Sequence, residues 1–183
     1  MLYSLKELQQ AYKAGVSMEF HFFWGHTPAD DGSITASCLS QWWESSFRIG
    51  GEQYSCAEQY MMAEKARLFG DNEMLEAIMK AKHPKEMKDY GRKVKGFNNE
   101  IWGSRCYDIV LKGNLAKFGQ NQVLWEYMKS CKNKIFVEAS PVDKIWGIGL
   151  AKDHPDVNNP MLWQGQNLLG FALSEVRDRL NQA

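Results

Sequence analysis

The sequence lacks any apolar run near the ~18 residues needed to cross a bilayer. It also lacks net charge, because 22 basic residues balance 22 acidic ones. We therefore expect neither a membrane protein nor a protein that attracts polyanions through its overall charge. No signal-peptide pattern, linker or low-complexity segment is seen. The apolar content of 44% is ordinary for a folded protein, so we expect a single domain over residues 1–183, located in the cytoplasm.

Cysteine is present at four positions, and its spacing matches neither a CxxC motif nor a zinc finger. The four cysteines, at positions 38, 56, 106 and 131, form no CxxC pair and combine with no histidine at zinc-finger spacing. We therefore expect reduced thiols. Three catalytic signatures are also missing: the P-loop, the HExxH zinc motif and the GxSxG nucleophile elbow.

Helical patterns dominate what is present, and strand patterns are few. Because the strands do not alternate regularly with helices, we predict an α+β fold, a single domain that is predominantly helical around a small β-sheet. The predicted helices cover residues 5–14, 55–69, 71–83, a short stretch from Pro84, 98–118, 121–131 and 167–180. The predicted strands cover residues 19–24 and 135–137, with a hairpin over 47–54 that turns at Gly50-Gly51.

One predicted helix carries an acid and an amine on the same face. Glu58 and Lys65 lie seven residues apart, about two turns and 10 Å along the axis, with Met61 and Met62 between them. An acid and a base beside an apolar strip can hold a small polar substrate. The alternative is structural, with residues 55–58 as a capping box that uses Glu58 and with Lys65 as a solvated helix lysine.

Two glycine-containing loops have the composition of ligand sites. Residues 137–149 lead from a strand into a loop with two carboxylates, a Trp and two Gly, and residues 163–170 lead into a helix. Glycine lets backbone N–H groups approach a phosphate or sugar, Trp offers a stacking face, and helix N-termini accept anions. The alternatives are a turn that requires positive φ around a core Trp, and an ordinary helix cap by Asn167.

A basic segment lies between residues 80 and 96. It contains seven Lys and Arg residues against Glu86 and Asp89, a local net charge of +5. This pattern indicates a solvated face, or a surface for phosphate or nucleic acid.

Taken in order, these segments resemble the NADAR superfamily, named for NAD and ADP-ribose, which includes the YbiA-like proteins. The resemblance covers about residues 20–180, which leaves residues 1–18 as an N-terminal helical extension. Six or more short motifs at compatible spacing make it specific. The motifs are Phe22-Phe23-Trp24-Gly25, Cys56 to Ala66, Gly91-Arg92, Trp102, Lys117-Phe118, Val137-Glu138-Ala139, Asp143 to Gly149, and Trp163 to Gly170.

The resemblance implies an N-glycosidase, a hydrolase acting on N-glycosyl compounds, with no metal or organic cofactor. One branch of the family acts on early phosphoribosyl intermediates of riboflavin biosynthesis, and another removes ADP-ribose from guanine in nucleic acid. The implied partners are therefore a nucleotide-like small molecule (ADP-ribose or a phosphoribosyl substrate) or ADP-ribosylated nucleic acid, and no membrane. A non-catalytic module that binds NAD or ADP-ribose, and more distantly a nucleic-acid scaffold, stay open as alternatives.

Cleavage of an N-glycoside creates an oxocarbenium-like centre at the anomeric carbon. A carboxylate can stabilise this centre, or it can activate the water that attacks it. Glu58 is our first candidate for this role, with Asp143 assisting. If the ribose ring opens, Lys65 would attack the anomeric carbon to form a Schiff base, which requires a lowered pKa, for example through Met61 and Met62. The candidate substrate-binding residues are Trp24, Gly25, Trp102, Trp146 and Trp163 around base and sugar, Arg92 (with Lys93 second) for phosphate, and Glu138, Gly147, Gly149 and Asn167.

Overall fold

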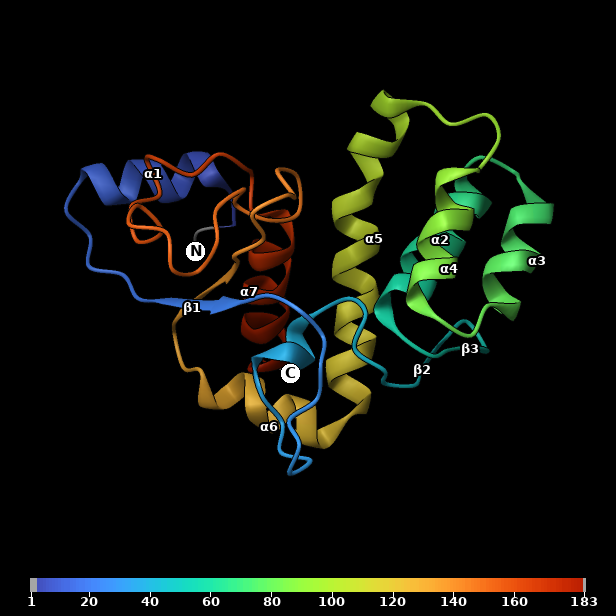
Figure 1. Cartoon of the computed structure of the whole chain (residues 1–183), viewed down its shortest axis with the longest axis horizontal. Helices are drawn as coiled ribbons and strands as arrows, with labels where there is room; N and C mark the ends of the chain where they lie inside the picture. The colour runs from blue at the N-terminus through green and yellow to red at the C-terminus, as the bar shows by residue number, and fades with distance from the viewer. Residues whose placement is uncertain (1–2, 183) are drawn as a thin grey trace. The chain divides into compact units, whose positions relative to one another are not determined.

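The computed structural model describes residues 3–182, and these form seven α-helices, one 3-10 helix and four short strands (Figure 1). The predicted α+β class is confirmed. The chain contacts separate two compact units. Unit 1 comprises Met1–Ser40 and Val123–Ala183, and unit 2 comprises the continuous segment Gln41–Gln122.

Unit 2 begins with the predicted hairpin. Strands β2 (Phe47–Ile49) and β3 (Glu52–Tyr54) pair antiparallel, with Phe47 opposite Tyr54. Gly50 and Gly51 both have positive φ, 61° and 87°. Two such residues in a row are what a tight type I′ hairpin turn requires, and glycine adopts them without a steric penalty.

Four helices complete unit 2: α2 (Ala57–Leu68), α3 (Asn72–Lys80), α4 (Pro84–Arg92) and α5 (Asn99–Gln120). Figure 1 shows them as neighbours, and α2 contacts each of the other three. Eight of the twelve residues of α2 are buried, so it is the central helix of the unit. Asp71 and Asn98 cap the starts of α3 and α5, and Pro84 occupies the first turn of α4.

Unit 1 is built around a second pair of strands. The first part of the chain supplies α1 (Leu5–Lys13), β1 (Phe20–Phe23) and the 3-10 helix η1 (Ala36–Leu39). The last part supplies α6 (Gln122–Ser130, whose first residue ends unit 2), β4 (Ile135–Glu138) and α7 (Leu168–Leu180). Strand β1 pairs with β4 in parallel, Phe20 opposite Ile135, and α7 packs against β4. The β structure is thus two separate two-stranded sheets, because the hairpin belongs to unit 2.

Candidate functional site

Glu58 is the second residue of α2, and it is not part of a capping box. The helix starts one residue later than the sequence indicates, with Cys56 at the N-cap, so that Gln59 takes the third position. Gln59 Oε1 accepts hydrogen bonds from the backbone N–H of Ser55 at 2.8 Å and from its hydroxyl at 3.1 Å. The structural role that the sequence offered for Glu58 is therefore wrong, although the residue is only 6% exposed.

Lys65 lies two turns along the same helix, and its ammonium faces aromatic rings. The Nζ atom is 4.3 Å from the ring centroid of Phe97 and 5.6 Å from that of Trp102. Burial lowers the pKa of Lys65, Arg92 lowers it further, and the nearby Glu58 charge opposes both. The lowered pKa agrees with our prediction, but aromatic side chains surround the amine where we expected the two methionines.

Met62 packs against α4. A Cβ atom on Gly91 would lie 2.0 Å from Met62 Sδ, so this helix crossing depends on the absence of a side chain at position 91. The close crossing brings the end of α4, with Arg92, toward Lys65, whose pKa senses the arginine charge. Unit 2 thus brings together Glu58, Lys65, Arg92 and Trp102 from three helices.

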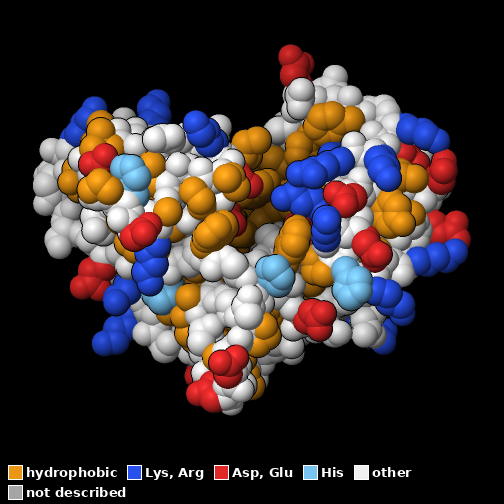
Figure 2. Space-filling view, viewed as in Figure 1, with side chains coloured by type: hydrophobic (Ala, Val, Ile, Leu, Met, Phe, Trp, Pro, Cys, Tyr) orange, Lys and Arg blue, Asp and Glu red, His pale blue; other side chains and the backbone are white. Residues whose placement is uncertain are grey.

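The basic segment forms an exposed face along α4. Figure 2 shows Lys and Arg side chains gathered over this helix. Three cations of the segment have carboxylate partners: Lys80 with Glu76, Lys95 with Glu73, and Arg92 with Asp89 at 3.6 Å. Lys88 instead lies over the ring of Trp42, 5.7 Å from its centroid, and Lys93 over that of Tyr90 at 5.6 Å.

In unit 1, Asp143 organises the loop that follows β4. Its Oδ1 accepts hydrogen bonds from the backbone N–H groups of Ile145 and Trp146, each at 2.8 Å. Its own carbonyl accepts from the N–H of Gly149 at 3.1 Å, where φ is +69°. The loop therefore contains the positive-φ turn of the alternative, but Trp146 is partly exposed and is not the core Trp that the alternative included. The Gly149 N–H is already used within the loop.

Gly147 lies where this loop passes the end of β4. A Cβ at this position would be 2.8 Å from the carbonyl oxygen of Glu138, the last residue of the strand. Glycine is therefore required for close packing of the backbone. Glu138 itself is partly buried, and Trp146 is partly exposed.

Asn167 has a structural role, but it is not the helix cap that we considered. It precedes α7 with φ +54°, and its side chain makes no capping hydrogen bond. The amide instead accepts from the backbone N–H of Glu138 and donates to the carbonyl of Phe136, both at 3.0 Å. With no exposed surface, its side chain joins α7 to β4 and is not placed to donate to a substrate.

The tryptophans of unit 1 differ in accessibility. Trp24 follows β1 and is 60% exposed, beside Gly25 with φ +82°. Trp163 is 7% exposed, packs with a centroid separation of 5.3 Å against Phe20 and donates its indole N–H to the Val157 carbonyl at 2.8 Å. Its expected role as a stacking face does not fit this placement, since the ring is part of the core.

Sequence reasoning missed Phe97 and Gln41. Phe97 is 41% exposed and precedes the cap of α5, a position from which apolar residues often pack against the following helix. The backbone carbonyl oxygen of Gln41 accepts a hydrogen bond from the backbone N–H of Glu58 at 2.9 Å. The only sequence signal of Gln41 is that it lies, with Ser40, between the apolar residues Leu39 and Trp42.

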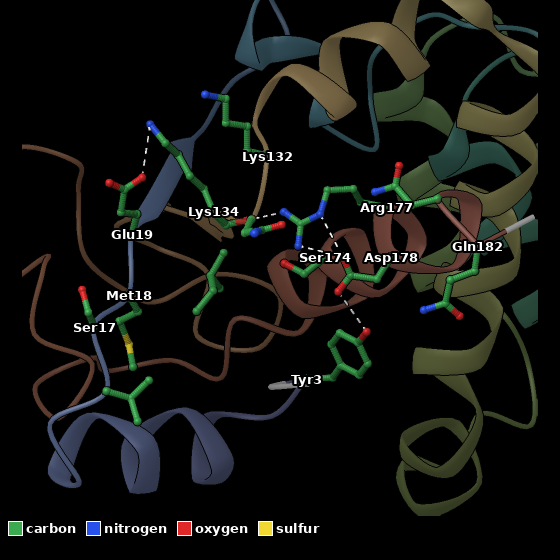
Figure 3. A pocket seen from close by; sticks show the side chains of 14 residues that line it. Tyr3, Ser17, Met18, Glu19, Lys132, Lys134, Ser174, Arg177, Asp178 and Gln182 are labelled. Atoms are coloured by element: carbon green, nitrogen blue, oxygen red, sulfur yellow. Dashed lines mark hydrogen bonds and ion pairs between the residues drawn. The ribbon is translucent and has the colours of Figure 1, made fainter.

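Unit 1 also contains a pocket of about 760 Å³ that none of the predicted site residues line (Figure 3). Several of its polar side chains bind one another. Arg177 donates to Asp178 and to the Lys134 carbonyl, and Asp178 accepts from the hydroxyl of Tyr3. The pocket therefore does not carry the predicted chemistry.

No group of three or more His, Cys, Asp or Glu side chains within residues 3–182 is arranged to hold a metal ion. Over the same residues, every helix is too short or too polar to span a bilayer.

Comparison with known proteins identifies relatives over most of the chain. It is 42% identical over 170 residues to the N-glycosidase R617 of Acanthamoeba polyphaga mimivirus, covering 90% of this chain and 98% of that protein. It is 38% identical over 130 residues to the protein irg-1 of Caenorhabditis elegans, covering 70% of this chain and 61% of irg-1. The chain thus spans about three fifths of the irg-1 length.

A solved structure has the same fold. The NMR structure of the E. coli protein YbiA matches with a TM-score of 0.71 over 100% of this chain and 94% of that one, at 21% identity. At this identity the likeness concerns the fold alone. The sequence pattern of the NADAR domain matches residues 22–181. The chain therefore belongs to the NADAR domain family.

Proposed function

We propose that the chain is an N-glycosidase that hydrolyses the ribosyl N-glycosidic bond of a nucleotide-like substrate, with Glu58 as the principal catalytic carboxylate. Membership of the NADAR family and 42% identity to a named N-glycosidase support the reaction class. The observation that carries the role of Glu58 is its burial at the start of α2, where Gln59, and not Glu58, accepts the backbone N–H of Ser55.

Two features place positive charge near Glu58. The N-terminal end of a helix carries a partial positive charge that stabilises a carboxylate. The Lys65 ammonium on the same face interacts favourably with it. A fixed anion at this place stabilises positive charge that develops at the anomeric carbon, and it accepts a proton from an attacking water.

The test is Glu58→Gln, which keeps the shape and removes the charge. We expect kcat to fall by about 100-fold or more, because the charge acts mainly on the transition state. ADP-ribose binding, measured by calorimetry, should persist. Glu64→Gln on the same helix is the matched control. A Glu58→Gln protein that retains full turnover would exclude this role.

For Lys65 we propose attack on the ring-opened sugar. The amine lone pair would form a bond to the anomeric carbon, which still carries the base after ring opening. The bond from this carbon to the base nitrogen would then break, with that nitrogen taking a proton that the lysine nitrogen gives up, so that the base leaves and a lysine Schiff base forms. Addition of water to the Schiff base would release the sugar and regenerate the lysine. The lowered pKa supports this role, because it increases the neutral fraction of the amine. Borohydride added during turnover should trap a sugar adduct on Lys65, detected by peptide mass analysis. Full activity of Lys65→Arg without any adduct would exclude the covalent route.

For phosphate we propose the α4 face. Lys85, Lys88 and Arg92 are spaced at i, i+3 and i+7, so they share one side of the helix. This face suits the phosphates of ADP-ribose or of a phosphoribosylamine, and its length also suits a nucleic acid that carries ADP-ribose. Offering guanine-ADP-ribosylated oligonucleotide and the riboflavin-pathway phosphoribosylamine in parallel, with free base as the readout, distinguishes the two substrates.

The remaining predicted residues keep lesser proposed roles. Asp143 uses Oδ1 within its own loop, and we propose that Oδ2 assists at the substrate. Trp24 and Trp146 remain proposed stacking residues, and Trp102 lies beside the Lys65 amine. The alternative is a non-catalytic module that binds NAD or ADP-ribose. It predicts that Glu58→Gln changes neither turnover nor ligand binding appreciably. The cytoplasmic location remains a prediction.

A further inference from the structure

Gln41 is a buried glutamine whose amide N–H groups have no oxygen partner. The residue is 9% exposed. Its Oε1 accepts a hydrogen bond from Asn114 Nδ2 at 2.8 Å, whereas its Nε2 lies 4.0 Å from Met61 Sδ. An amide nitrogen has two N–H donors, and thioether sulfur is a weak acceptor. Within residues 3–182, Nε2 donates to no oxygen atom.

The hydrogen bonds of Asn114 determine the orientation of the Gln41 amide, that is, on which side its Oε1 and its Nε2 lie. Asn114 has no exposed surface, and its Nδ2 also donates to the carbonyl of Val110 at 2.9 Å. This second bond requires the nitrogen of Asn114, and not its oxygen, at that place. Gln41 must then present its oxygen to Asn114, which leaves its Nε2 on the Met61 side.

Gln41 contacts the first turns of α2, the helix that carries the proposed catalytic carboxylate. The Gln41 backbone carbonyl accepts the N–H of Glu58 at 2.9 Å. Met61, which Nε2 approaches, is three residues after Glu58 and therefore on the adjacent turn of α2. A donor in a buried residue gains little from a thioether sulfur at 4.0 Å, compared with what an oxygen acceptor would give. A ligand held by Glu58 would supply the missing acceptor.

We infer that Gln41 is a substrate-contacting residue, whose Nε2 donates a hydrogen bond to an acceptor oxygen of the N-glycoside, either a ribose hydroxyl or a base carbonyl. This inference rests on the proposed function of Glu58. Asn114 is the positioning residue, because it holds the amide with the donors toward the substrate. A group that offers only N–H at this place would be rejected, since Gln41 presents no acceptor there.

Gln41→Met is the main test, since Met preserves length and apolar packing and removes both donors. Loss of one hydrogen bond to the substrate should lower kcat/KM by about tenfold. The substitution also removes the Oε1 acceptor of Asn114, whose Nδ2 keeps only its bond to Val110, so we expect a modest fall in melting temperature and compare kcat/KM well below it. Gln53→Met, an exposed glutamine in the same unit, is the matched control and should behave as wild type.

Substrates that lack one oxygen identify the contact. We expect the tenfold penalty on the parent compound and none on the one analogue without the partner oxygen, among 2′-deoxyribosyl, 3′-deoxyribosyl and decarbonyl-base forms. Asn114→Leu should lower kcat/KM in the wild-type background and add nothing to Gln41→Met. A Gln41→Met protein as active as wild type, or an equal penalty on every analogue, would overturn the inference.

A wild-type protein that cleaves none of the offered N-glycosides would refute the proposed function separately. The Gln41 inference is then decided by calorimetry with ADP-ribose. Binding that weakens about tenfold in Gln41→Met supports the contact. Unchanged or absent binding excludes it.

Discussion

Lys65 shows how opposing effects on one residue decide its reactivity. Burial and the Arg92 charge favour the neutral amine, whereas Glu58 favours the cation. The rings of Phe97 and Trp102 also attract the ammonium, with Phe97 closer at 4.3 Å. The direction of the net shift shows that burial is the larger effect. The residue is thus a cation that deprotonates more readily than a surface lysine.

The lowered pKa of Lys65 predicts how the stability of the protein depends on pH. Between the lowered folded pKa and the ordinary value of 10.5, the unfolded chain binds more protons at Lys65 than the folded one. Stability from this group therefore rises with pH in that window. We expect the unfolding free energy of wild type, relative to Lys65→Met, to increase as pH rises toward 10.5 and then to level off. Urea titrations across about pH 8 to 11 measure it; a pH-independent difference would contradict it.

Sequence patterns predicted which helix or strand carries a residue better than they predicted what that residue does. The spacing of Glu58 and Lys65 was enough to place them on one helix. Asn167 and Trp163 were misjudged because their partners, at Phe136 and Val157, are backbone carbonyls. Such contacts depend on how loops pack against strands, which no local pattern encodes.

At the scale of elements, α5 contains two glycines in contrasting surroundings. A Cβ on Gly113 would lie 2.6 Å from a ring carbon of Tyr60, a residue only 1% exposed. A Cβ on Gly103 would meet nothing within 4 Å. Gly113 therefore allows α5 to pack against α2, and the structure gives no packing reason for Gly103.

We expect Gly103→Ala to stabilise the protein by about 1 kcal/mol, because alanine favours the helix over glycine. Gly113→Ala should destabilise it by about 1–3 kcal/mol through overpacking against Tyr60. Urea denaturation of the two variants side by side provides the comparison. Equal effects of the two substitutions would show that the Tyr60 contact does not govern the packing.

Element types were predictable where a local rule applied. The Gly50-Gly51 hairpin, the Asp71 cap and Pro84 at the start of α4 all follow from single-residue preferences. The start of α2 was misplaced by one residue because Ser55 is a better cap than Cys56 in isolation. The parallel pairing of β1 with β4 was not predicted, since it joins segments more than a hundred residues apart.

At the scale of the whole molecule, the N-terminal helix lies before the family match at residues 22–181 but is joined to unit 1. Leu8 of α1 has no exposed surface, and Gln9 donates to the Pro160 carbonyl at 2.9 Å. Tyr3 donates to Asp178 of α7 at 3.0 Å. The helix therefore contributes to the core of unit 1.

We expect Leu8→Ala to lower the unfolding free energy by about 2–5 kcal/mol, the usual cost of removing a buried leucine. Val16→Ala, at a position 52% exposed, is the control and should change stability by less than about 0.5 kcal/mol. Chemical denaturation measures both. A neutral Leu8→Ala would mean that α1 is only loosely attached.

The parallel pairing of β1 with β4 has a consequence for biosynthesis. A ribosome releases Phe20–Phe23 long before Ile135–Glu138 exists, and the whole of unit 2 is translated in the interval. At the usual 5–20 residues per second, roughly 5 to 25 seconds pass before the strand meets its partner. During that time a Phe-His-Phe-Phe segment is available to holdase chaperones or to neighbouring nascent chains. We therefore expect the order of translation, as well as the stability of the finished protein, to affect the yield of folded molecules.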